Sequence, residues 1–114
     1  MKSFLSLFLI ACSATVFGQG PSTEEVIRRV ADNVIQNTSF KFINTNTKEK
    51  YDSTKGLASS PDIKADSKYN KWMYVNGVLT IGMMQTANVL NDKKYSDYSL
   101  HNFSFIFELL IGEW

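Results

Sequence analysis

The sequence is poor in the residues from which metal centres and disulfides are built. It holds one cysteine and one histidine in 114 residues. A single cysteine cannot form an internal disulfide or a cysteine-based metal site. His101 has no serine, cysteine or carboxylate around it at a telling spacing, so we expect a solvent-facing or merely hydrogen-bonded side chain. No P-loop, nucleophile elbow, zinc signature or dinucleotide fingerprint is present.

The chain also lacks an excess of charge of either sign. Twelve lysines and arginines stand against 11 aspartates and glutamates, which gives a formal net charge of +1. No electrostatic argument therefore favours nucleic acid or an anionic membrane as a partner. Aromatic residues, by contrast, make up 13% of the sequence. This share is typical of a packed globular domain and too high for a disordered chain.

Residues 1–18 have the pattern of an export signal, with Lys2 followed by an apolar stretch. Two ways of processing stay open: cleavage after Gly18, or lipoprotein processing with a lipid anchor at Cys12, whose preceding residues resemble a lipobox. We favour cleavage, because the residues after Cys12 stay apolar, whereas a lipoprotein usually turns polar directly after its cysteine. In either case we expect an exported protein, periplasmic or extracellular, with residues 19–114 forming its domain.

An amphipathic helix is predicted for residues 22–36. Ser22 and Glu25 form the sequence pattern of a capping box and place an acid at the positive end of the helix dipole. The apolar residues that follow recur on one face as far as about Gln36. The charged residues fall elsewhere, so we expect one buried face and one solvated face.

Residues 37–70 are polar and contain several turn signals. We expect a long loop with short extended pieces, of which Phe40–Ile43 could form a brief strand. Two interpretations stay open, because a connection of this length is either the rim of an active site or a plain surface excursion. None of its acidic residues forms a recognisable pair or a metal-binding spacing.

The stretch Tyr69–Gly77, with the uncharged run that continues it to Asn91, is the most informative part of the sequence. A bilayer span needs about 20 predominantly apolar residues, and this run has too many amides and threonines, so we expect no membrane span. A helix buried inside a protein is the better prediction, with neighbours on most sides, because its apolar residues fall on more than one face. Gly77 and Gly82 favour a close approach of another backbone or a ligand.

A short turn at Asn91–Lys94 leads into a third helix. Aromatic and apolar residues recur there at helical spacing, namely Tyr95, Tyr98, Asn102, Phe105, Ile106 and Leu109. The second and third helices should therefore form an antiparallel hairpin. The chain ends at Trp114 within an apolar run, which we interpret as a truncated or frame-shifted reading of a longer protein.

The order of these features resembles the N-terminal part of glycoside hydrolase families 88 and 105, the unsaturated glucuronyl and rhamnogalacturonyl hydrolases. The resemblance rests on Trp72–Gly77, which reads Trp-x-Tyr-x-x-Gly at the entry of the second helix, and on the turn Asn91–Tyr95. In that turn the aspartate and the tyrosine match the family pattern, while asparagine stands where the families have glycine. The resemblance spans roughly residues 26–107, although its specific motifs cover much less.

The resemblance implies an all-α fold, an (α/α)6 toroid of helical hairpins, of which this chain would supply an N-terminal fragment. The first helix would be outer, the second inner and the third outer. Loops that enter the inner helices line the pocket of such toroids, which would put Trp72, Tyr74 and Asn76 at its edge as substrate-binding residues. The catalytic aspartates would lie beyond Trp114, so the resemblance assigns none within this chain.

A complete toroid would bury the apolar positions of the second helix, which would be its most buried element. We expect Val78, Ile81 and Leu90 to be almost inaccessible in such a structure. In this chain alone, one side of the helix would lie bare.

Family members remove an unsaturated uronic acid from oligosaccharides that polysaccharide lyases produce. The implied chemistry is hydration of the C4=C5 double bond by an aspartate acting as general acid and base, with no metal or organic cofactor. The implied partner is an unsaturated oligosaccharide, whose exact structure stays open. The rival interpretation is an exported helical-repeat binding or scaffold module without catalysis, because the predicted hairpin also resembles a tetratricopeptide unit; no second copy at a period of about 34 residues is visible.

Overall fold

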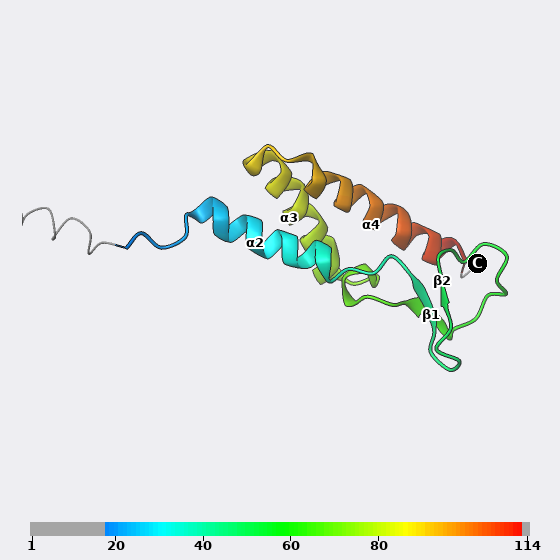
Figure 1. Cartoon of the computed structure of the whole chain (residues 1–114). Coiled ribbons are helices and arrows are strands. Elements are labelled where there is room, and N and C mark those ends of the chain that lie inside the picture. Colours follow the sequence, from blue (N-terminus) through cyan, green and yellow to red (C-terminus); the bar gives the residue numbers. More distant parts are fainter. Residues whose placement is uncertain (1–17, 113–114) are drawn as a thin grey trace, which may run out of the picture.

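The computed structural model describes residues 18–112 (Figure 1). In chain order, the elements are α2 (Thr23–Gln36), β1 (Phe42–Asn44), β2 (Lys50–Tyr51), β3 (Ile63–Ala65), the short 3₁₀ turn η1 (Lys68–Asn70), α3 (Tyr74–Leu90) and α4 (Lys93–Gly112). The fold is thus mostly helical, with a small sheet. The expected export signal and the alternative anchor at Cys12 lie outside the described residues, apart from Gly18.

The helix α2 begins at the predicted capping box. The hydroxyl of Ser22 accepts a hydrogen bond from the Glu25 amide at 3.2 Å, and the Glu25 carboxylate accepts one from the Ser22 amide at 2.8 Å. The buried face of α2 carries Ala31 and Val34, which belong to a hydrophobic cluster shared with α3 and α4. The prediction of an amphipathic first helix is confirmed.

The segment between α2 and α3 folds into a three-stranded antiparallel sheet in the order β2-β1-β3. Phe42 of β1 is fully buried and stacks on Phe105 of α4, with ring centroids 4.3 Å apart. This stacking places the sheet beside the C-terminal half of α4 (Figure 1). The predicted brief strand is confirmed in part, since β1 begins two residues later than Phe40.

The sheet corrects the all-α expectation. Its strands are two or three residues long, which is too short for an alternating pattern to be recognised in the sequence. Their pairing joins segments that lie far apart along the chain, and Phe42 pairs with both Tyr51 and Ala65. Such pairing depends on tertiary contacts rather than on local propensity.

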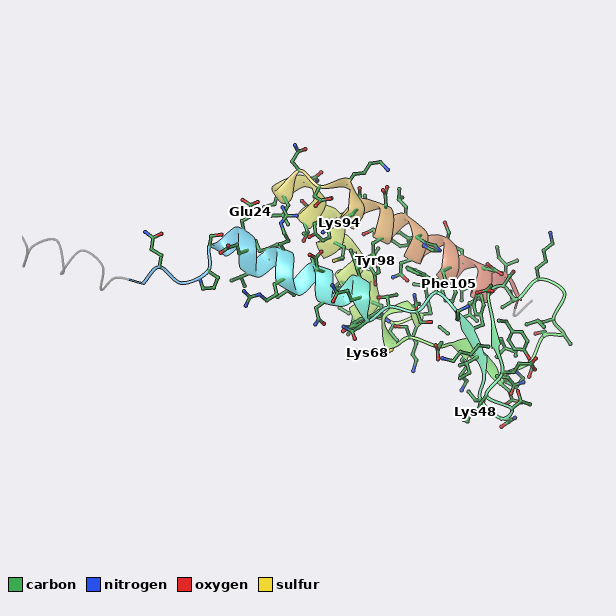
Figure 2. The ribbon with its side chains drawn as sticks, viewed as in Figure 1. Glu24, Lys48, Lys68, Lys94, Tyr98 and Phe105 are labelled. Atoms are coloured by element: carbon green, nitrogen blue, oxygen red, sulfur yellow. The ribbon has the colours of Figure 1, made fainter. Side chains whose placement is uncertain are left out.

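The helices α3 and α4 form the predicted antiparallel hairpin. The buried residues of α3 follow alternating steps of four and three residues, namely Asn76, Thr80, Met83, Ala87 and Leu90. This is the spacing of a helix–helix seam. The facing residues of α4 include Tyr95, Tyr98, Asn102 and Phe105, all buried, and Figure 2 shows Tyr98 and Phe105 following one another along α4.

The turn of the hairpin has a left-handed residue. Asn91 has φ 47° and ψ 46° and closes the C-terminal end of α3. Glycine is the usual residue at this kind of helix end, and asparagine is the next most tolerant. Asn91 therefore suits the left-handed conformation of this turn.

A smaller part of the surface of α3 is buried than we expect for an inner helix that is covered on most sides. Leu90 is buried, but Val78 and Ile81 are 50% and 60% exposed. Apart from the chain neighbours and the backbone of α3 itself, no heavy atom of the described residues lies within 4 Å of the place that a Cβ would take at Gly77 or Gly82, so these glycines serve no close approach of another element here. One flank of α3 lies bare, as expected for this chain alone.

Within residues 18–112, none of the helices has both the length and the apolar character that crossing a bilayer requires.

Candidate ligand-binding groove

An apolar groove of about 540 Å³ lies between the start of α3 and the second half of α4. The wall on the α3 side is formed by Trp72, Met73, Tyr74, Gly77, Val78 and Ile81, and the wall on the α4 side by Phe103 and Ile106. Thr80, which is almost inaccessible, lies at its floor, and Lys71 lies at its margin. The volume is in the range of small-molecule sites.

Two of the three residues that the resemblance puts at the pocket's edge meet at this groove. Trp72 is 66% exposed and Tyr74, the first residue of α3, is 88% exposed. Neither is therefore a core residue in this structure. A large aromatic side chain that is exposed at the rim of an apolar groove is a frequent feature of recognition sites.

Asn76, the third of these residues, lies beneath the groove rather than in its wall. Its side chain is buried, and its Nδ2 donates to the carbonyl oxygens of Lys68 and Lys71, both at 2.8 Å. The structure does not bring this amide to the groove. Its donors hold the main chain that leads to Trp72.

A buried polar layer continues from Asn76 across the hairpin. Asn102 of α4 donates from Nδ2 to the carbonyl of Tyr69 and to Thr80 Oγ1, each at 3.3 Å, and it accepts from Asn70 Nδ2 at 3.2 Å. Asn70 and Asn102 are fully buried, and Asn70 Oδ1 has no hydrogen-bond partner among the described residues. The sequence offered one signal for this layer, an asparagine at position 102 within an otherwise aromatic and apolar stripe.

The entrance of the groove is electrically positive. The helix α3 starts at Tyr74 without a side-chain cap and without an acid in its first turn, so the positive end of its dipole is not neutralised locally. Lys71 is the one charged residue among those that line the groove, and no carboxylate is among them. This arrangement favours an anionic group, and the residues that line the groove include no carboxylate and no histidine.

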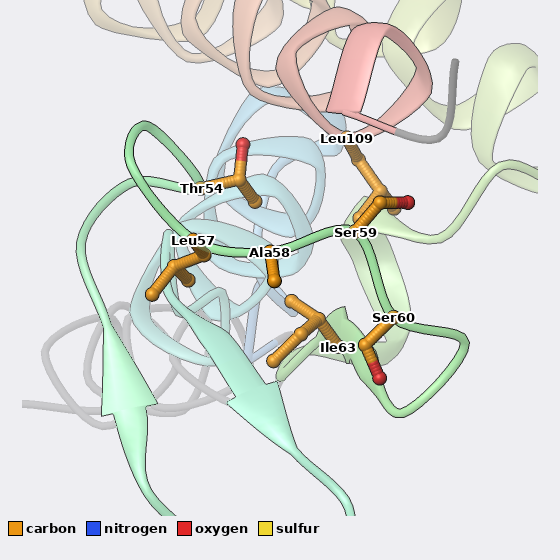
Figure 3. A pocket seen from close by; sticks show the side chains of 7 residues that line it. All are labelled: Thr54, Leu57, Ala58, Ser59, Ser60, Ile63 and Leu109. Carbon is orange, nitrogen blue, oxygen red and sulfur yellow. The ribbon is translucent and has the colours of Figure 1, made fainter.

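Two further hollows lie around the segment that connects β2 and β3. One, of about 40 Å³, is lined by Leu57, Ala58, Ile63 and Leu109 together with small polar residues (Figure 3). It is too small for a sugar ring. The other borders Phe107 and Glu108 of α4 and is wide open.

Glu108 fastens this connecting segment to α4. Its Oε1 accepts hydrogen bonds from the Ser53 hydroxyl, from the Thr54 amide at 2.8 Å and from the Thr54 hydroxyl at 3.4 Å. The hydrogen bond from Ser53 is the main cause that lowers the pKa of Glu108, although partial burial opposes it. Since Glu108 is engaged with the chain's own donors, we assign it a structural role.

No metal site is found in the described part of the chain, where no three His, Cys, Asp or Glu side chains gather. His101 is exposed and stacks on Phe40, with ring centroids 3.8 Å apart. The expectation of a solvent-facing histidine is confirmed.

Comparisons of this chain with protein-family models, with curated proteins and with solved structures find no match. The fold and the groove define a mostly helical protein whose α3–α4 hairpin carries an open apolar site with two aromatic residues and a lysine at its margin.

Proposed function

We propose that the groove at the start of α3 binds an acidic sugar, and that the chain is the N-terminal part of an exported glycoside hydrolase acting on unsaturated uronides. The observation that carries the proposal is the exposure of Trp72 and Tyr74 together at one apolar groove. Hydration of the C4=C5 double bond is the reaction that we propose for the complete protein.

The groove offers each kind of contact that such a ligand needs. A sugar ring has apolar faces of C–H groups, for which Trp72 provides a flat wall, and hydroxyls, for which the Tyr74 phenol is a hydrogen-bonding partner. Lys71 and the uncapped start of α3 favour the uronate carboxylate. A neutral sugar would use the aromatic wall but not this charge.

The arrangement of the helices supports the toroid as the finer fold. An amphipathic α2 and an α4 with one buried stripe flank α3, which has no charged residue. The small sheet is then an insertion between the first outer helix and the first inner helix.

We further propose that this chain binds the sugar without hydrating it. General acid–base catalysis needs a titratable group within hydrogen-bond reach of the reacting atom, and the residues that line the groove include no carboxylate and no histidine. The ultraviolet absorbance of an unsaturated disaccharide should therefore stay constant in the presence of the purified chain. A steady loss of this absorbance would contradict the assignment of catalysis to other parts of the protein.

The rival function, a helical-repeat scaffold, has less support. The α3–α4 hairpin fits one tetratricopeptide unit, which is a helix pair joined by a short turn, but a three-stranded sheet separates it from α2, so α2 is not part of a preceding unit stacked through a short turn. We therefore prefer the sugar-binding proposal.

A fluorescence titration tests the proposal. The chain has two tryptophans, so a Trp114→Phe background leaves Trp72 as the reporter. We expect a saturable change of Trp72 emission with an unsaturated uronate disaccharide, and affinity weaker by about tenfold in Tyr74→Phe, because one hydrogen bond is lost.

Two variants that each remove one lysine charge test whether Lys71 contributes to the affinity for the uronate. Lys71→Gln should weaken binding of the uronate by about two- to fivefold, as for a solvent-exposed ion pair, and leave a neutral disaccharide unaffected. Lys68→Gln is the matched control, since Lys68 is exposed, does not line the groove and lies over the Tyr69 ring. The proposal would be contradicted if neither the uronate nor the neutral disaccharide gave a saturable response.

A further inference from the structure

We infer that Asn76 and Asn102 are positioning residues, whose buried carboxamides hold the main chain of residues 68–71 so that Lys71 and Trp72 stay at the rim of the groove. The inference deepens the proposed function of the groove and rests on it. It also gives Asn76 a role other than direct contact with the ligand.

Side chains from two helices hold the one turn formed by residues 68–71. Asn76 of α3 donates to the carbonyls of Lys68 and Lys71, and Asn102 of α4 donates to the carbonyl of Tyr69. Three main-chain acceptors within four consecutive residues are thus bound by side chains from the hairpin. The last of them belongs to the residue directly before Trp72.

The turn depends on these donors. A 3₁₀ turn has poorer hydrogen-bond geometry than an α-helix, and the turn bond within η1, from the Asn70 amide to the Ser67 carbonyl, is long at 3.4 Å. The bonds from the two amides to these carbonyls are partly buried, and a partly buried carbonyl that loses its donor must find another partner. Without Asn76 and Asn102, these carbonyls would have to turn toward solvent, and the path of the chain into Trp72 would change with them.

The position of the polar layer is informative. The same seam is closed by Met83, Ala87 and Leu90 toward the hairpin turn, where apolar contact suffices. Next to the groove, the seam is closed instead by the side-chain amides of Asn76 and Asn102. Asn70 Oδ1 is left without a partner in this layer, and local arrangements that stability alone would not select occur most often at functional sites.

Holding the rim in place should strengthen binding. A side chain that is already ordered loses less conformational freedom when a ligand binds, so preorganisation raises affinity without any new contact. A mobile segment 68–71 would present the same Lys71 and Trp72 to the sugar at a higher entropic cost.

Asn76→Asp in the Trp114→Phe background tests the inference. The change preserves side-chain size, removes both donors and sets a carboxylate oxygen where Nδ2 faced the two carbonyl oxygens, so it should release residues 68–71. An acid in the first turn of α3 is favoured by the helix dipole, so the helix should persist. We expect far-ultraviolet circular dichroism like that of the parent, a larger amplitude of fast local motion of Trp72 in time-resolved anisotropy, and uronate affinity weaker by about tenfold.

Ser99→Ala is the matched control. Ser99 is fully buried in the same layer, and its hydroxyl donates to the carbonyls of Thr80 and Tyr95, with no bond to residues 68–71. This variant should lower thermal stability while Trp72 motion and uronate affinity stay at the parent's values. A purely structural role of the layer would instead make both variants behave alike.

A second variant keeps the test decisive if Asn76→Asp does not fold. Asn102→Ser removes the bond to the Tyr69 carbonyl from the opposite helix and should also increase Trp72 motion. Unchanged Trp72 anisotropy in the folded variants would overturn the inference even if the parent binds the sugar. If the parent binds no sugar, the proposed function fails, whereas the anisotropy still decides whether the amides position Trp72.

Discussion

The two ends of the α3–α4 hairpin are held together by different kinds of interaction. At the turn end, around Asn91–Tyr95, charged side chains at the surface connect the hairpin to α2. Arg28 of α2 contacts Asp92 at 2.8 Å, and Lys94 contacts Asp32 at 2.8 Å; Figure 2 labels Lys94 and Glu24 in this region. At the groove end, around Lys71–Tyr74, buried amides bind main-chain carbonyls.

The difference shows how one hairpin serves two purposes. Ion pairs that are partly open to solvent contribute little each and tolerate movement, and the packing of Leu90 and Tyr95 behind them closes the turn end. Buried amides, in contrast, are satisfied in a single arrangement of the chain. We therefore expect the turn end to govern stability, and we propose that the buried amides of the groove end fix the conformation of the residues that line the groove.

The largest expected effect is on the turn end. Tyr95 is fully buried, and its hydroxyl contacts Asp32 at 2.9 Å. Tyr95→Ala should lower the free energy of unfolding by about 3–5 kcal/mol, because a large aromatic side chain leaves a cavity. Urea denaturation measures this loss in the free energy of unfolding. Tyr95→Phe, which keeps the ring, should cost about 1 kcal/mol; a similar loss in both variants would show that the packing contributes nothing.

A smaller effect concerns the segment that Glu108 fastens beside the sheet. The pKa of Glu108 is lowered in the folded state, so the carboxylate contributes stability above the unfolded-state pKa, about 4.3, and this contribution is lost as the pH falls through the lower folded-state pKa. Glu108→Gln should reduce the melting temperature by a few °C at pH 7. Its melting temperature should approach that of the parent near pH 3, and a constant difference across this range would contradict the prediction.

The smallest expected effect is on the surface ion pairs of the turn end. The hydrogen bond from Lys94 lowers the pKa of Asp32, and the bond to Asp92 raises the pKa of Arg28. Arg28→Gln should lower the melting temperature slightly at low salt. The difference should vanish at about 1 M salt, where charges are screened over about 3 Å. A loss that persists at high salt would indicate packing by the Arg28 stem.

Much of the fold follows from local patterns in the sequence. The capping box at Ser22 and Glu25 predicts the start of α2, and the spacing of Tyr95, Tyr98 and Asn102 predicts the buried stripe of α4. Each depends on residues within a few positions of one another. One brief strand was indicated near Phe42, but the pairing of three strands into a sheet could not be predicted, because it depends on long-range contacts such as the stacking of Phe42 on Phe105.

The site was predictable in part for a similar physical reason. Trp72 and Tyr74 were predicted at the edge of a pocket, as aromatics at a helix entry, and both line the groove. The position of the Asn76 amide depends on the path of residues 68–71, which the sequence does not specify locally. Asn70 gave no signal at all, since an asparagine before a helix is also common in exposed turns.

The most direct test of the central claim is saturation-transfer NMR between the purified chain and an unsaturated uronate disaccharide. We predict transfer from the protein to the sugar-ring protons in the parent and its loss in Trp72→Ala. Trp72 is exposed, so this change should leave the fold intact, which circular dichroism checks. Equal transfer in the parent and in Trp72→Ala, or none in the parent, would contradict the claim that the groove at the start of α3 binds an acidic sugar.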